Sequence, residues 1–284
     1  MKSIFLRNNL IYIRNKSMVF YSLFSVFISL IIYSLFIGRN IESNFSENPY
    51  GNIIAQQWLL GGILSITPIT VSLSCFSIMV RDKYYGALDD FFIAPVKKYE
   101  ISGGFILSSV VISLLMCIIQ ILLFIIIIAE NPLDFFESTQ FFKLLTALFI
   151  STLFGSSMSY FLSIFFKNPS TYGSANSLIS TIIGFTNGVF LDLGSFPDSM
   201  LPIIKLLPTS HISVIFRNIL LKPRISTVFD NTDSLLLRSF SENMGISFYI
   251  GNREISLMES LIYVFIWSSV FFMLSVIKGN KNDK

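Results

Sequence analysis

The sequence predicts an all-α integral membrane protein with six transmembrane helices and both termini in the cytosol. Three observations support this fold class. The chain of 284 residues is 53% hydrophobic and only 13% charged, whereas soluble domains are about one quarter charged. Several apolar runs reach the roughly 20 residues that a helix needs to cross a bilayer. Lys and Arg gather in alternate connecting segments, as they do in cytosolic loops.

Six apolar runs are long enough to be transmembrane helices. We place them at residues 18–37, 57–80, 103–129, 144–166, 172–191 and 258–277. The only charged residue inside them is Glu259, at the outer edge of the last run. Ion-coupled carriers usually keep charged side chains within the membrane, so this composition argues against that class. A single membrane domain, residues 1–284, accounts for the whole chain.

The distribution of positive charge predicts the orientation. Basic residues cluster before the first run, after the second and after the last, whereas the two short outer loops hold only Arg39 and Lys143. Because Lys and Arg accumulate in cytosolic loops, both termini are predicted to be cytosolic. We expect a multi-pass protein of a plasma membrane, of bacterial type, with lipid as one of its partners.

Residues 1–17 form a segment of their own, in which Ile and Leu alternate with Lys2, Arg7, Arg14 and Lys16. This pattern predicts an amphipathic helix that lies on the cytosolic membrane surface. The alternative is a frayed basic tail that serves only as a topology signal.

The sequence lacks the residues of an enzyme or a metal site. It contains no GxxxxGK[ST] phosphate loop, so it cannot bind ATP by that route. His211 is the only histidine, and Cys75 and Cys117 lie in apolar runs, where cysteine is usually a packing residue. The net charge of +3 is too small to indicate nucleic acid. We expect no catalytic residue, metal or cofactor in this chain.

The segment RDKYYGALDDFFIAPVKKYE, residues 81–100, separates the second and third runs. Helical spacing groups aromatic and apolar side chains on one face: Tyr84, Tyr85, Leu88, Phe91 and Phe92. Asp89 and Asp90 lie beside this face, and Pro95 would end the helix. Exposed aromatics with a charged rim are typical of a protein interface. A helix that only anchors the loop on lipid is the alternative.

This segment resembles the loop motif of type-2 ABC exporter permeases, E-[KR]-E-x-G-T-L-E-x-L-L-x-T-P-V. The matching residues are Arg81, Asp82, Lys83, Gly86, Ala87, Leu88, Asp89, Phe91, Phe92, Ala94, Pro95 and Val96. Asp82 and Asp89 stand where the family has Glu, and Ala87 where it has Thr. In that family the short helix couples the membrane chain to its ATPase. The resemblance thus implies coupling residues, namely Arg81, Asp82, Tyr84, Tyr85, Gly86, Leu88, Asp89, Phe91, Phe92 and Pro95.

Residues 192–257 form a long predicted exterior segment between the fifth and sixth runs. Its stretch 199–221 is apolar but contains Lys205, His211 and Arg217, which are costly in lipid. We therefore expect a re-entrant or interfacial element that protein shields, followed by a polar loop or small cap. The resemblance extends here to the family's Gly-aromatic and proline-rich patterns, which implies the translocation and re-entrant residues Asn187, Gly188, Phe190, Pro197, Pro208 and Arg217.

The resemblance implies the permease subunit of an ABC exporter of the drug- or antibiotic-resistance type. A separate P-loop ATPase would bind ATP and Mg²⁺, and a second copy or a sister permease would complete the pathway. Uncharged spans favour a hydrophobic or amphipathic cargo. A lipid-linked polysaccharide exporter and a non-transporting scaffold or enzyme are the alternatives. Pro68, Gly184 and Gly188 are candidate hinges, or ordinary packing residues.

Overall fold

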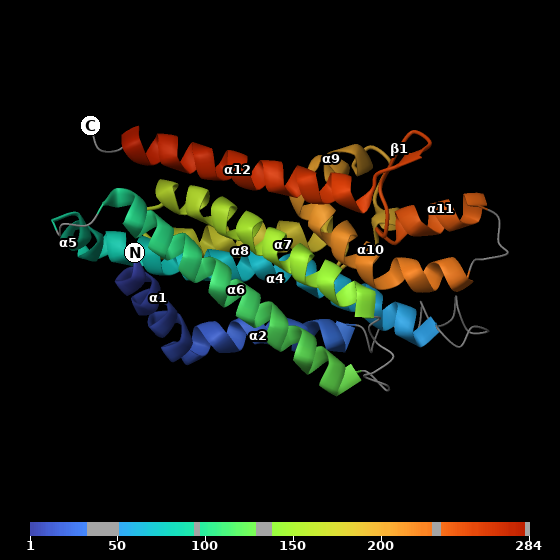
Figure 1. Cartoon of the computed structure of the whole chain (residues 1–284), viewed down its shortest axis with the longest axis horizontal. Coiled ribbons are helices and arrows are strands. Elements are labelled where there is room, and N and C mark those ends of the chain that lie inside the picture. The colour runs from blue at the N-terminus through green and yellow to red at the C-terminus, as the bar shows by residue number, and fades with distance from the viewer. Residues whose placement is uncertain (33–50, 94–96, 129–137, 229–233, 282–284) are drawn as a thin grey trace.

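The computed structural model describes residues 1–32, 51–93, 97–128, 138–228 and 234–281, and this part of the chain is a bundle of long helices (Figure 1). Its elements in chain order are α1 Lys2–Arg14, α2 Lys16–Ile32, α4 Gly51–Tyr84, α5 Ala87–Ile93, α6 Lys98–Ile128, α7 Ser138–Phe165, α8 Pro169–Thr186, η2 Leu193–Ser195, α9 Leu201–Leu206, α10 Pro208–Val228, α11 Ser234–Asn243, β1 Tyr249–Ile250, β2 Arg253–Glu254 and α12 Leu257–Lys281.

Four helices of the described residues are long and apolar enough to cross a membrane: Gly51–Tyr84, Tyr99–Ile127, Gln140–Phe165 and Leu257–Lys278. They coincide with the second, third, fourth and sixth predicted spans. The first and fifth predicted spans fall on α2 and α8, and α8 ends at Thr186 rather than at Leu191. Residues 33–37 and Ala129 lie outside the described residues. Six spans and two cytosolic termini stay predictions.

Helix α4 is the central helix of the bundle, and it packs against α6, α7, α8 and α10. Most of its side chains between residues 54 and 80 are buried. Pro68 lies inside this helix, and Gly155 of α7 packs on the Pro68 carbonyl, where a Cβ would come within 2.5 Å of the oxygen. Small residues allow helices to approach closely in membranes, so the crossing of α4 and α7 depends on Gly155.

Hydroxyl and amide groups join the buried faces of α4, α6 and α7. The Ser72 hydroxyl lies 3.0 Å from that of Ser113 and 3.4 Å from that of Ser156. Thr67 donates to Gln120 Oε1 at 2.6 Å. Because a bilayer core offers no water to buried polar groups, they must find partners inside the protein. The helices are thus fixed to one another by neutral polar contacts as well as by apolar packing.

The outer helices expose two different kinds of surface. Helices α6 and α12 expose large apolar side chains such as Ile126 and Met273, which suit lipid. Helix α8 exposes a mixed face, in which the apolar members are Leu178, Ile182 and Phe185 and the hydroxyl-bearing members are Thr171, Ser174, Ser177 and Thr181. Since small and hydroxyl-bearing residues mark helix contacts rather than lipid contacts in membranes, α8 differs in kind from α6 and α12.

Residues 192–257, called the cap below, are described except for 229–233 and lie at the end of the molecule opposite α5 (Figure 1). The predicted re-entrant stretch forms α9 and the 21-residue helix α10, which packs against α4, α7 and α12. The polar stretch that follows forms α11 and an antiparallel hairpin, in which Tyr249 pairs with Glu254 and Ile250 with Arg253. The polar stretch therefore contains regular structure, and its role as an exterior loop or cap stays a prediction.

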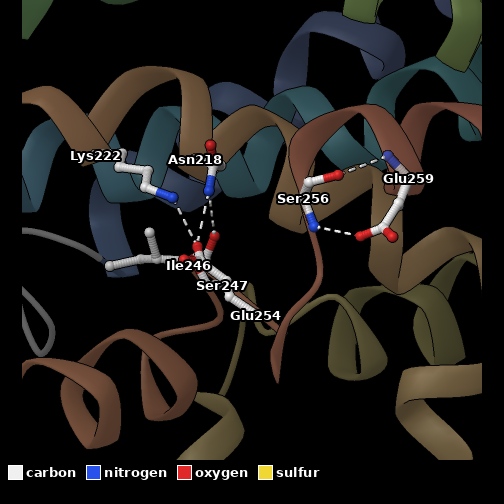
Figure 2. Close-up of polar contacts among 7 residues, drawn as sticks. All are labelled: Asn218, Lys222, Ile246, Ser247, Glu254, Ser256 and Glu259. Carbon is white, nitrogen blue, oxygen red and sulfur yellow. Dashed lines mark hydrogen bonds and ion pairs between the residues drawn. The ribbon is translucent and has the colours of Figure 1, made fainter. Parts of the chain in front are cut away.

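Polar contacts tie the hairpin to α10 (Figure 2). Lys222 Nζ lies 2.7 Å from Glu254 Oε1, and the Ser247 hydroxyl donates to the same oxygen at 2.7 Å. Asn218 donates through Nδ2 to the carbonyl of Ile246 at 3.3 Å and lies 3.4 Å from the Ser247 hydroxyl. Residues far apart in the sequence therefore form one unit with α10.

Helix α12 begins with a reciprocal capping pair (Figure 2). The backbone N–H of Ser256 donates to Glu259 Oε2 at 2.8 Å, and the N–H of Glu259 donates to the Ser256 hydroxyl at 3.2 Å. This arrangement satisfies N–H groups that a helix start leaves without partners. Glu259, the one charge in the predicted spans, therefore has a structural role, and it also pairs with Arg253.

Candidate functional site

The predicted coupling loop begins as a continuation of α4. Helix α4 runs to Tyr84, and α5 follows after a two-residue turn. Gly86 in this turn has φ +78°, and a Cβ at this position would meet nothing within 4 Å. Glycine is therefore required here for its left-handed backbone conformation alone. The turn also changes the helical phase between Tyr84 and Leu88, which a single continuous helix would place on one face.

The side chains of the loop do not point as the sequence predicted. Leu88 is only 6% exposed and belongs to the main apolar core, and Phe91 packs partly buried against that core. The prediction that both present an exposed face is therefore wrong. Among the described residues of the segment, the exposed aromatic side chains are Tyr84 (56%), Tyr85 (74%) and Tyr99 (66%), and Arg81, Asp90 and Lys97 are exposed as well. The rings of Tyr84 and Tyr85 meet edge to face, with 5.1 Å between their centroids.

Arg7 of α1 joins the end of α4 to α5. Its Nη1 donates to Asp82 Oδ2 at 2.7 Å and its Nη2 to Asp82 Oδ1 at 2.8 Å. The guanidinium also lies 5.4 Å from the centre of the Phe91 ring. Such a two-pronged ion pair fixes orientation as well as distance. We call Arg7, Asp82 and Phe91 the Arg7 brace. Because Asp82 is buried in it, its carboxylate faces α1 and is not presented to a partner chain.

The N-terminal segment is helical, as the sequence predicted, and forms α1. Its buried face, which includes Ile4 and Tyr12, packs against α6. A Cβ on Gly104 of α6 would come within 2.9 Å of Ile4, and Ser108 donates to Asn9 at 2.7 Å. A second apolar stripe is exposed and consists of Leu6, Leu10 and Ile13. The position of this stripe at a membrane surface stays a prediction.

Some predicted coupling residues lie partly or wholly beyond what the structure describes. Pro95, with its neighbours 94 and 96, is outside the described residues, and so are the side chains of Asp89 and Phe92. Arg81 is exposed on the last turn of α4. Lys83 donates to the carbonyl of Ile164 near the end of α7 at 3.3 Å, so the end of α4 is fixed to α7 as well as to α1.

A second group of predicted residues gathers at the other end of α4. Asn187 is the C-cap that follows α8, and its Nδ2 donates to the Ser65 hydroxyl of α4 at 3.0 Å. Gly188, with φ +67°, presents its carbonyl to Nη2 of Arg217 at 2.5 Å. The structure thus brings Asn187, Gly188 and Arg217 together at the junction of α4, α8 and α10.

The other predicted residues of this region lie around the junction. The ring of Phe190 packs on Gly184, where a Cβ would come within 2.2 Å of a ring carbon. Gly184 is therefore a close-packing position, which supports the packing alternative over the hinge there. Pro197 is exposed after η2, and Pro208 is the first residue of α10, where proline's missing N–H costs nothing.

Arg217 is the centre of the junction and is 0% exposed. Its guanidinium lies 4.2 Å from the centre of the Trp58 ring, and its Nη1 donates to the carbonyl of Met244 at 3.2 Å. The indole N–H of Trp58 donates to the same carbonyl at 2.8 Å. Among the described residues, no carboxylate forms an ion pair with Arg217.

Glycines from three segments surround the Arg217 side chain. A Cβ would approach atoms of Arg217 within 2.9 Å at Gly61, 3.3 Å at Gly62, 3.0 Å at Gly188 and 2.9 Å at Gly245. We call these four glycines, Trp58 and Met244 the Arg217 cradle. A Cβ at Gly61 would press on the Cγ and backbone of Arg217, and a Cβ at Gly188 or Gly245 would press on its guanidinium, so the cradle packs closely around this side chain.

Sequence reasoning missed Arg7 and Trp58. The sequence places Arg7 on the polar face of an interfacial helix or in the topology signal, although it lies three residues after Ile4 and four before Ile11, on the packed face of α1. That spacing was the available signal for an inward role. Trp58 precedes the pair Gly61 and Gly62 by about one turn, but nothing in the sequence shows which cation lies against its ring.

Comparison with known proteins adds one match. Residues 1–221 match a family model described as ABC-2 type transporter. The matched region includes the Arg7 brace, the loop that follows α4, helix α8 and Arg217, and it ends within α10. A search of curated proteins finds no match.

Proposed function

Since the chain belongs to the ABC-2 type transporter family and is thus a membrane-embedded ABC transporter permease, we propose that it exports a hydrophobic or amphipathic cargo such as a drug, toxin or lipid-like molecule. A separate ATPase subunit supplies the energy, and a second permease completes the pathway. The observation that carries this proposal is the exposed Tyr84–Tyr85 pair on a loop that α1 holds rigidly in place.

The geometry of this loop suits ATPase docking. Tyrosine is enriched among residues that dominate binding energy at interfaces, because it presents a large rigid surface with a polar tip. Tyr84 and Tyr85 are the last turn of α4 and the turn after it, so they are part of a rigid element. A displacement applied there acts along α4, whose 34 residues extend about 50 Å. The Arg217 cradle lies near its other end.

The mixed face of α8 supports the amphipathic nature of the cargo. The exposed hydroxyls of Ser177 and Thr181 alternate with Leu178 and Ile182. The hydroxyl groups of such a face find no partner among lipid tails, but they suit a neighbouring helix or a partly polar pathway. We therefore place α8 at the meeting surface of two permeases, where cargo passes.

Docking is tested by replacing both Tyr84 and Tyr85 with Ala. In gentle detergent, the tagged native chain should copurify with a P-loop ATPase, and the double variant should lose it. Tyr21→Ala is the matched control, because Tyr21 is 70% exposed on α2. Full retention of the ATPase by the double variant, or its equal loss in Tyr21→Ala, would contradict docking at this site.

The meeting surface is tested by cysteine cross-linking in native membranes. Ser177→Cys should form a disulfide-linked pair of chains on mild oxidation, whereas Leu122→Cys, on the lipid-like face of α6, should not. The native thiols of Cys75 and Cys117 are buried, so they give little background. Equal cross-linking at both positions would exclude α8 as a specific contact between copies.

A further inference from the structure

We propose that Arg217 is a latch, which holds the cap closed against α4 and the end of α8 and releases during each transport cycle. This inference rests on the proposed function, because a latch acts only in a protein that is driven between two states. Arg217 belongs to α10 and therefore to the cap. Its ring and carbonyl partners come from α4, from the second residue after α8, and from the turn after α11.

The groups in direct contact with Arg217 are all neutral, although the Asp192 carboxylate attracts it from a greater distance. A guanidinium carries five N–H donors, and two of its nitrogens, Nη1 and Nη2, donate to carbonyls. The Nε–H of Arg217 is buried without a partner. A buried charge that has no carboxylate in direct contact has lost its hydration without full compensation. Water that enters when the cap moves would restore that hydration, so the closed state has only a small advantage over an open one.

The geometry of the cradle makes release an all-or-none event. The four glycines fit closely around one side-chain position, so the guanidinium cannot slide by degrees. Movement of α10 away from α4 breaks the contact with the Trp58 ring together with the hydrogen bond to Gly188. Close packing of this kind favours two discrete arrangements over continuous deformation, as a transport cycle requires.

Trp58 reports on the latch directly. The chain has two tryptophans, so Trp267→Phe leaves Trp58 as its only one. We would purify this variant with the ATPase that accompanies it and compare the empty complex with the complex trapped by Mg-ATP and vanadate. A matched complex with both tryptophans replaced by Phe gives the emission of the ATPase for subtraction. The latch predicts red-shifted emission of Trp58 and stronger quenching by acrylamide in the trapped state.

The outcomes separate the latch from the proposed function. Identical Trp58 emission in the empty and trapped states of a complex that hydrolyses ATP would overturn the latch and leave the exporter standing. If no ATPase accompanies the chain, the proposed function fails, and the latch fails with it.

Two variants show whether the role of Arg217 goes beyond folding. Arg217→Lys keeps the charge but loses the fork that reaches two carbonyls. The difference in Trp58 emission between the two states should therefore shrink. Lys222→Met, on the same helix, should leave that difference unchanged. Arg217→Lys protein that elutes as a folded complex and shows the full difference would contradict the latch.

Discussion

Two arginines bind the two ends of α4 by different chemistry. Arg7, at the loop end, forms a two-pronged pair with Asp82 at 2.7 and 2.8 Å, and its side chain is one third exposed. Arg217, at the cap end, is fully buried and bound by two carbonyls and the Trp58 ring. A carboxylate in direct contact compensates the first charge, whereas the second has dipoles, a ring and only the more distant Asp192 carboxylate.

This difference indicates which of the two contacts stays intact and which one separates during transport. Separating Arg7 from Asp82 would leave a carboxylate alone in a buried position, which is strongly unfavourable. Separating Arg217 from its direct contacts leaves two carbonyls and an indole ring behind, and these neutral groups are easily hydrated. We therefore expect the loop end to move as one rigid unit and the cap end to open.

The largest expected loss of stability comes from substituting a glycine with positive φ beside Arg217. Gly245→Ala adds a Cβ that would lie 2.9 Å from both Nη1 of Arg217 and a methyl carbon of Leu193, at φ +65°. Strain and overpacking together should cost about 3 kcal/mol. Unfolding can be followed with a thiol-reactive dye, because both native cysteines are buried.

Gly86→Ala is the matched control at the loop end. It has φ +78° but open space around the added Cβ, so only the backbone cost of about 1 kcal/mol is expected. An equal loss of stability at Gly86 and Gly245 would show that the cradle is not tightly packed around Arg217.

A double-mutant cycle measures how strongly Arg7 and Asp82 are coupled at the loop end of α4. Arg7→Met leaves Asp82 buried without its partner and should cost about 2 kcal/mol, because the pair is only partly shielded from water. Asp82→Leu added to Arg7→Met should recover part of this loss, which the thiol-dye midpoint measures. Lys205→Met is the control, since its pair with Glu242 is more exposed overall. Simple additivity of Arg7→Met and Asp82→Leu would contradict direct coupling.

The sequence predicted much of this fold because membrane helices obey a simple rule of length and apolarity. Four of its predicted spans coincide with long apolar helices. It also singled out Arg217, because a charge in an apolar stretch must have a protein partner. It could not identify Trp58 and Met244 as those partners, since they lie 159 residues before and 27 residues after Arg217.

The sequence failed at the loop for a physical reason. Periodicity places Leu88 and Phe91 with Tyr84 only if one helix continues, and the left-handed turn at Gly86 interrupts it. Leu88 and Phe91 then pack inward, and the tyrosines remain outside. Periodicity also gives no information about contacts between distant segments, so the pairing of Arg7 with Asp82 could only be seen in the structure.

A smaller effect is expected at the ring of the Arg217 cradle. Trp58→Phe keeps an aromatic face for Arg217 but removes the indole donor, while Met244 O still accepts from Nη1. The loss should be about 1 kcal/mol, the net value of one hydrogen bond. Trp267→Phe, on α12, should change the thiol-dye midpoint much less. A greater loss at Trp267 would show that the cradle contributes little to stability.

The smallest effect concerns the pH dependence of the cap. Partial burial of Glu254 opposes ionisation, but hydrogen bonds from Lys222 and Ser247 outweigh it and lower the pKa of Glu254 below its ordinary value of 4.5. A lowered folded-state pKa stabilises the fold above pH 4.5 and loses that contribution as the pH falls through the folded value. The contact is partly exposed, so the loss should be below about 1 kcal/mol.

Helix content followed by circular dichroism during heating should therefore show a lower midpoint at pH 3.5 than at pH 6. Glu254→Gln and Lys222→Met should both flatten this dependence, because each removes the same ion pair. If the unfolding midpoint of both variants still falls with pH as in the native chain, the acid sensitivity belongs to other carboxylates. The contacts of the two arginines at the ends of α4 are unaffected by that outcome.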